Sequence, residues 1–261
     1  MSSITCCTGF IHSGKPSGDE ESINGVKCYV AKPKVSNSHA IVIATDIFGY
    51  TLPNSRLIAD SFAKEGYYCV VPDLFEGTEP PADVMTDFDN LMSKTATLSQ
   101  KVYAFFRVLW YGPKFLLFNS ASSGIKIIEK VLPDVKKSYT KVGVQGYCWG
   151  GKIAALMAHH DGLIDAATAA HAGGLTYPTD IQNIKVPTFF MNAEEDHAIT
   201  VEQKQTIERI MNEKGSKFGS KIYPGVKHGF AVRGNENDGN DKTQRAQAFL
   251  DSVSFYKRIW E

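Results

Sequence analysis

Apolar residues recur along the chain in two alternating patterns. Short runs rich in Val, Ile and Ala are separated by longer stretches in which apolar residues return every three or four positions, as in Leu57, Ile58 and Phe62. The first pattern predicts β-strands and the second predicts amphipathic helices. Their alternation predicts an α/β fold, a mostly parallel central sheet with helices on both faces. The predicted strands are Val26–Ala31, Ile41–Thr45, Tyr67–Val71, Val142–Gln145, Ala166–Ala170, Thr188–Asn192 and Lys221–Tyr223.

The segments with helical spacing lie between these predicted strands or after the last of them. Asn54 is expected to cap the first helix, because its side chain can accept a hydrogen bond from a free backbone N–H. The segment 74–124 is the least regular, since it contains Pro80-Pro81, many aromatic residues and Gly112-Pro113, a pair expected to break a helix. We expect excursion helices there beside the mouth of a site, either a partial lid or ordinary packing helices. The predicted helices are Ser55–Glu65, Leu98–Leu109, Ser122–Val131, Lys152–His160, Val201–Glu213 and Lys242–Lys257.

Composition narrows the class of protein. A chain of 261 residues that is 43% apolar fits one large domain over residues 1–261. Its formal net charge of zero predicts neither a nucleic-acid partner nor an anionic membrane surface, and no apolar run approaches the ~20 residues that span a bilayer. The N-terminus lacks the pattern of a secretory signal. We expect a cytoplasmic protein, monomeric or a small homo-oligomer.

The five cysteines are odd in number and lack the spacing of a disulfide framework, which predicts reduced thiols. Cys28 and Cys69 lie in strand-like runs and are expected in the core. The pair Cys6-Cys7 has no matching distant pair, so a structural zinc site is disfavoured. No metal and no cofactor are expected.

The fifth cysteine carries the most specific signal. Gly146-Tyr147-Cys148-Trp149-Gly150 follows the predicted strand Val142–Gln145 and precedes a predicted helix. This strand–turn–helix context is typical of the nucleophile elbow of α/β-hydrolases, here with cysteine in place of serine. Glycine on both sides would allow the strained turn to pack closely. A chance Gly-x-Cys-x-Gly string in a glycine-rich turn is the alternative, and the flanking strand and helix argue against it.

A thiol nucleophile needs a base, and the base needs an orienting acid. In open α/β sheets such groups follow the carboxyl ends of strands. Asp196 follows one predicted strand, with Glu195 as the weaker alternative, and His228 follows the last one. The order Cys148, Asp196, His228 is that of α/β-hydrolases. His171, after Ala166–Ala170, is either a substrate contact or a buried polar group.

The early loop after Ile41–Thr45 supplies the remaining candidates. The N–H groups of Ile47 and Trp149 are the expected oxyanion donors, since this fold uses the residue after the nucleophile and one from an early loop. Asp46 would then place a carboxylate close to the thiol, which disfavours a thiolate.

These motifs together resemble the dienelactone hydrolase family of α/β-hydrolases, in particular its fungal and related eukaryotic members. The segments that match those of the family are the elbow, Asp46-Ile47-Phe48-Gly49, Pro72-Asp73-Leu74-Phe75, Asp196-His197 and His228-Gly229-Phe230. At Asp46 the family has glutamate, and this chain has aspartate. The resemblance implies that Asp46 helps to deprotonate Cys148, which attacks a lactone or ester carbonyl to give an acyl-enzyme.

The resemblance also implies how substrate is bound. Bacterial members hold the substrate carboxylate with two arginines, but here the first segment continues as Glu76-Gly77-Thr78. Arg233 remains as the candidate for a substrate carboxylate, or else it is a surface residue, and Phe48 is expected to contact substrate. The prediction is a cofactor-free cysteine hydrolase of small-molecule esters or lactones.

Two alternatives stay open. A thioesterase or broad carboxylesterase would use the same triad. A weakly active relative could bind a small ligand or sense oxidants through Cys148. A disulfide oxidoreductase is disfavoured, because the chain has no Cys-x-x-Cys.

Overall fold

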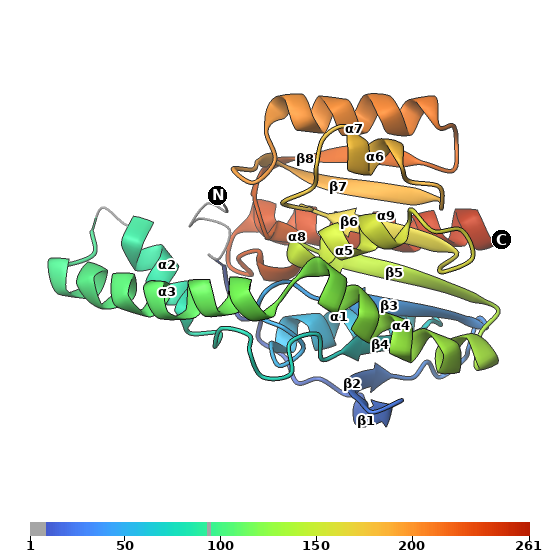
Figure 1. Cartoon of the computed structure of the whole chain (residues 1–261), viewed down its shortest axis with the longest axis horizontal. Coiled ribbons are helices and arrows are strands. Elements are labelled where there is room, and N and C mark those ends of the chain that lie inside the picture. The colour runs from blue at the N-terminus through green and yellow to red at the C-terminus, as the bar shows by residue number, and fades with distance from the viewer. Residues whose placement is uncertain (1–8, 93–94) are drawn as a thin grey trace.

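A central sheet organises the protein. The computed structural model describes residues 9–92 and 95–261. Eight strands form one sheet in the order β1-β2-β4-β3-β5-β6-β7-β8. The first two are antiparallel at one edge and the other six run parallel, which confirms the predicted mostly parallel sheet (Figure 1). The strands are β1 (Asp19–Ile23), β2 (Val26–Ala31), β3 (His39–Ala44), β4 (Tyr68–Pro72), β5 (Lys141–Tyr147), β6 (Ala166–Ala170), β7 (Thr188–Glu195) and β8 (Gly219–Lys227).

Helices cover both faces of this sheet (Figure 1). On strand β3, Ile41 and Ile43 join the apolar cluster under one layer of helices, while Val42 and Ala44 join the cluster under the other. Because neighbouring side chains of a strand point to opposite faces, a strand covered on both sides is apolar throughout. One layer contains α1 (Pro53–Lys64), α8 (Phe230–Arg233) and α9 (Gly239–Trp260), and the other contains α4 (Ala121–Ser138), α5 (Trp149–Met157), α6 (Thr179–Gln182) and α7 (Val201–Glu213).

The edge strand β1 was not predicted. Its sequence, Asp-Glu-Glu-Ser-Ile, is polar and lacks the alternation of a half-buried strand. It pairs with β2 through a tight turn at Asn24-Gly25, where both residues have positive φ, 49° and 79°. Asn-Gly is the preferred sequence of such hairpin turns, so the signal lay in the turn rather than in the strand.

The expected cap at Asn54 is wrong. Helix α1 begins at Pro53, and its N-cap, Leu52, makes no side-chain cap bond. Asn54 is instead fully buried within the first turn. Its side chain accepts a hydrogen bond from the backbone N–H of His12 at 2.9 Å and donates to the carbonyls of Phe10 and Val232. It thereby ties the N-terminal segment to the body of the protein.

The predicted break at Gly112-Pro113 is also wrong. Helix α3 (Leu98–Phe118) continues through it, starting from a capping box formed by Thr97 and Gln100. A proline removes one intrahelical hydrogen bond, and the rest of this long helix is retained. With α2 (Val84–Met92), α3 extends beyond the sheet at the left of Figure 1. Its exposed apolar side chains include Val102, Phe105, Phe106, Leu109, Trp110 and Leu117. That this excursion forms a lid remains a prediction.

His12 fixes the N-terminal segment to the start of α9. Its ring is buried, with Nε2 2.8 Å from the Gly234 carbonyl and Nδ1 2.6 Å from Nη1 of Arg245. Nη1 of Arg245 also contacts Nε2. Because the Gly234 carbonyl can only accept, Nε2 carries the proton and Nδ1 is the acceptor for the arginine. Burial lowers the pKa of His12 below its usual 6.5, and the charge of Arg245 acts in the same direction. The folded protein therefore holds His12 neutral.

This burial predicts a loss of stability at mildly acidic pH. Below the unfolded-state pKa of 6.5, the unfolded chain binds a proton at His12 that the folded protein resists. The free energy of unfolding should therefore fall as the pH drops below that value, by up to about 1.4 kcal/mol per pH unit for one proton. Urea unfolding between pH 7.5 and 5.5 measures this slope. His12→Gln should flatten it, and a slope shared by both proteins would exclude His12 as its source. His160→Gln, at an exposed position, is the control.

Among the described helices, none combines the length and the apolarity needed to cross a bilayer.

Candidate active site

Neighbouring parallel strands bring the predicted site residues to one edge of the sheet. Cys148, His171, Asp196 and His228 directly follow β5, β6, β7 and β8, and Asp46 comes two residues after β3. These strands are consecutive in the sheet. Because carboxyl ends of parallel strands meet at the same edge, residues far apart in sequence converge there.

Cys148 lies at a strained turn between β5 and α5. Its φ is 52° and its ψ −112°, a conformation that side chains with a Cβ rarely adopt. Its N–H donates to the Ala170 carbonyl at 3.0 Å and to Nδ1 of His171 at 3.1 Å. A Cβ at Gly150 would lie 2.0 Å from the Ala44 carbonyl oxygen, and one at Gly146 would lie 2.2 Å from the Gly150 carbonyl oxygen. The turn therefore requires both glycines.

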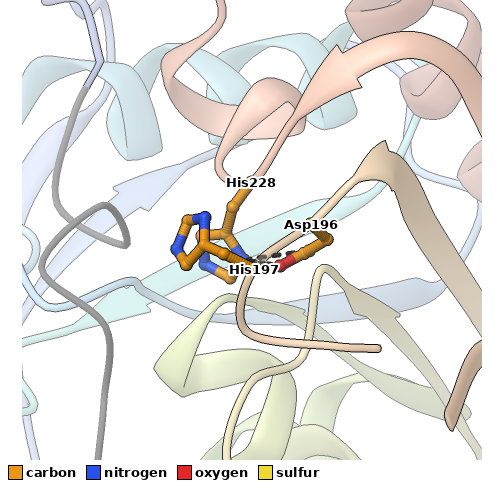
Figure 2. A group of neighbouring side chains, drawn as sticks. All are labelled: Asp196, His197 and His228. Atoms are coloured by element: carbon orange, nitrogen blue, oxygen red, sulfur yellow. Dashed lines mark hydrogen bonds and ion pairs between the residues drawn. The ribbon is translucent and has the colours of Figure 1, made fainter. Parts of the chain in front are cut away.

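His228 and Asp196 form a buried pair (Figure 2). Nδ1 of His228 lies 2.9 and 3.0 Å from the two carboxylate oxygens of Asp196, and both side chains are fully buried. A carboxylate can only accept, so Nδ1 carries the proton and Nε2 is left to accept another. Glu195, the weaker candidate for the acid, is exposed. The ring of His197 lies near that of His228, with centroids 5.4 Å apart and the planes tilted by 48°.

Among the described residues, the three side chains drawn in Figure 2 form the one group that could hold a metal ion. Ligand atoms of Asp196, His197 and His228 lie within 4.8 Å of one another. A metal bound by Nδ1 of His228 would replace the hydrogen bonds between His228 and Asp196, and so would destroy the pair described above.

Asp46 and Arg233 form a second buried pair. Nε of Arg233 donates to Oδ2 of Asp46 at 2.6 Å, and both side chains are fully buried. The N–H of Phe48 donates to the other carboxylate oxygen at 3.1 Å, and the guanidinium carbon lies 5.2 Å from the centre of the Phe48 ring. Arg233 is therefore an interior residue rather than a surface one, and its charge is paired with Asp46.

A cavity of about 610 Å³ opens beside the elbow. Cys148 contributes to its wall together with Ile47 and Trp149, the expected oxyanion donors. Trp149 is held by Phe75 and Phe115, with ring centroids 4.8 and 6.0 Å away. The remaining wall is mostly apolar and comes largely from the segment 74–124, including Pro80, Val84, Phe88, Val108, Tyr111, Phe115 and Leu116.

The other described cysteines are core residues, as predicted. Cys28 and Cys69 are fully buried. Burial raises the pKa of the Cys28 thiol to about 12 and that of Cys69 well above its usual value. Both thiols are therefore protonated and unreactive at neutral pH. The prediction for Cys6-Cys7 lies outside the described residues.

His171 and Phe48, two predicted substrate contacts, are not among the described residues that line this cavity, and their contact with substrate remains a prediction. His171 is fully buried, with its ring 4.9 Å from that of His228, and Phe48 is 1% exposed. The cavity wall instead includes Lys152, which sequence reasoning overlooked. Lys152 belongs to the first turn of the helix that follows the elbow, and this position could have revealed it.

A mostly parallel sheet with a cysteine elbow and a histidine after its last strand defines an α/β-hydrolase fold. The model of the dienelactone hydrolase family matches residues 26–260, and the chain belongs to this family of hydrolases. Hydrolase tropI of Talaromyces stipitatus is 31% identical over 263 residues, covering 98% of this chain and 96% of the relative. The carboxymethylenebutenolidase homolog of Xenopus tropicalis is 32% identical over 225 residues, covering 84% and 81%. The dienelactone hydrolase structure from Anabaena variabilis matches with a TM-score of 0.60 at 14% identity, covering 95% and 99%.

Proposed function

We propose that the protein hydrolyses small carboxylic esters or lactones through an acyl-enzyme on Cys148. The observation that carries this proposal is the buried His228–Asp196 pair, which follows strands at the same edge of the sheet as an elbow cysteine that lines a cavity. The names of the relatives, carboxymethylenebutenolidase homolog among them, support a lactone or ester as substrate.

The reaction begins with transfer of the thiol proton from Cys148 to Nε2 of His228. Asp196 holds the ring in the tautomer that accepts this proton and stabilises the imidazolium that forms. The thiolate attacks the carbonyl carbon, and the N–H groups of Ile47 and Trp149 stabilise the resulting oxyanion. When the C–O bond breaks, the leaving oxygen takes the proton from His228. In a lactone this oxygen stays attached as a hydroxyl group.

Hydrolysis of the acyl-enzyme repeats these steps with water. Nε2 of His228 accepts a proton from the water, whose oxygen attacks the thioester carbon. The second oxyanion collapses, the C–S bond breaks, and the sulfur recovers the proton. The products are a carboxylic acid and an alcohol, joined in one molecule when the substrate is a lactone.

Asp46 is the proposed carboxylate that assists the thiol, and Arg233 is proposed to act through it. An unpaired carboxylate beside Cys148 would raise the cost of a thiolate. The guanidinium of Arg233 balances this charge, with a separation of 2.6 Å between Nε and Oδ2. We assign His171 to positioning the elbow, because its Nδ1 accepts the N–H of Cys148. Phe48 positions the Asp46–Arg233 pair: its backbone N–H donates to Asp46, and its ring lies against the guanidinium of Arg233.

Mass spectrometry of the acyl-enzyme tests this proposal. With p-nitrophenyl pivalate, whose branched acyl group leaves a thioester slowly, we expect one pivaloyl group on the peptide that contains Cys148. Cys28→Ala should form the same adduct, because that thiol is buried and protonated. Release of p-nitrophenol by wild type with no acyl group on Cys148, or with the group on another residue, would rule out the nucleophile.

A further inference from the structure

Lys152 lies in the wall of the catalytic cavity. It belongs to the first turn of α5, which begins immediately after Cys148, and it borders the cavity together with Trp149 and His197. Its ammonium extends past the loop after β6, where Nζ lies 3.9 Å from the position that a Cβ would take at Gly174. Lys152 and Cys148 therefore border the same cavity.

The charge of this lysine is available to a ligand. Among the described residues that line the cavity there is no Asp or Glu, and Lys152 is the one Lys or Arg. Its ammonium makes no hydrogen bond or ion pair with the residues that the structure describes. By contrast, the guanidinium of Arg233 is buried against Asp46. An ammonium at the wall of a mostly apolar cavity attracts an anion more strongly than one in bulk water, because the local dielectric constant is lower.

We propose that Lys152 determines specificity by binding a carboxylate on the substrate, so that the preferred esters or lactones carry a negative charge. This inference rests on the proposed function, since it concerns the same cavity. It assigns the recognition of a substrate carboxylate to Lys152 rather than to Arg233. An ammonium is a compact donor that can reach a carboxylate from several directions.

Two esters of equal size test the assignment. One is the p-nitrophenyl half-ester of adipic acid, which carries a carboxylate, and the other has a neutral carboxamide in its place. We expect wild type to have a kcat/KM about tenfold higher for the anionic ester than for the neutral one, because one charge-assisted hydrogen bond contributes about that much to binding. The difference should lie mainly in KM. Lys152→Met should reduce this ratio to near one, and Lys152→Arg should keep most of it. Lys34→Met, an exposed lysine remote from the cavity lining, should behave as wild type.

Binding to the Cys148→Ala protein separates this inference from the proposed function. Calorimetry should show about tenfold tighter binding of the anionic ester than of the neutral one. Adding Lys152→Met should remove the difference. Equal binding of the two esters, or a preference that persists without the lysine, would overturn the role of Lys152 whether or not the enzyme turns them over. Selective binding with no turnover by wild type would reject the proposed hydrolysis alone.

Discussion

Replacing Cys148 by alanine is expected to lower kcat/KM for dienelactone and for a p-nitrophenyl ester by at least about 10⁴-fold, as for other catalytic triads that lose their nucleophile. The variant has no thiolate to form the acyl-enzyme, while the cavity and the His228–Asp196 pair remain. Alanine also fits the space left by the thiol, so the fold should persist. Steady-state kinetics of both substrates, beside thermal unfolding followed by circular dichroism, measure the two effects.

The outcome for the two substrates decides between the remaining hypotheses. Full activity in a folded Cys148→Ala protein would show that the elbow assignment is wrong. Loss of activity toward both substrates would support the cysteine hydrolase. The ratio of the two kcat/KM values in wild type would show whether the cavity favours the lactone. A folded wild type that hydrolyses neither would instead favour ligand binding or oxidant sensing at Cys148. Adding a thioester to the same assay separates an esterase from a thioesterase.

Arg233→Leu is expected to reduce the free energy of unfolding by about 3–5 kcal/mol, the usual cost of removing one partner of a buried ion pair. The substitution leaves the carboxylate of Asp46 in the interior without the guanidinium that lies 2.6 Å away. Asp46→Asn combined with Arg233→Leu should cost less than the sum of the single changes, because both charges are then absent. Urea unfolding of the four proteins gives the coupling energy.

An exposed pair provides the control for this cycle. Arg209 and Glu213 are 2.8 Å apart on α7, with side chains 58% and 60% exposed. Arg209→Leu should change stability by no more than about 0.5 kcal/mol, because solvent screens such pairs. If Arg233→Leu were equally mild, the Asp46–Arg233 pair would not contribute as its burial predicts.

The fold was predictable where local pattern and burial agree. Strands β2 and β6 and helix α7 have the predicted bounds, because strongly apolar or periodic segments encode their structure locally. Prediction failed at two positions where a local rule did not hold. Asn54 has the side chain of a helix cap, but it serves the backbone of the N-terminal segment instead. Pro113 lies inside α3, although proline usually ends a helix.

The convergence of the candidate site residues followed from sequence for a similar reason. Cys148, Asp196 and His228 each stand next to a predicted parallel strand, and parallel strands present their carboxyl ends at one edge. The order of motifs therefore predicts which residues share the site without any knowledge of side-chain contacts. The structure adds the hydrogen bonds between His228 and Asp196, at 2.9 and 3.0 Å.

The sequence by itself determined the mostly parallel sheet, the cysteine elbow with its two glycines, and the order of Cys148, Asp196 and His228 along the chain. Only the tertiary structure decided that Arg233 pairs with Asp46, 187 residues away in the chain, and that His171 supports the elbow. It also decided that Lys152 borders the cavity. The physical reason is that strands, turns and helices depend on neighbours in sequence, whereas the burial and pairing of a charge depend on segments that meet only in the folded protein.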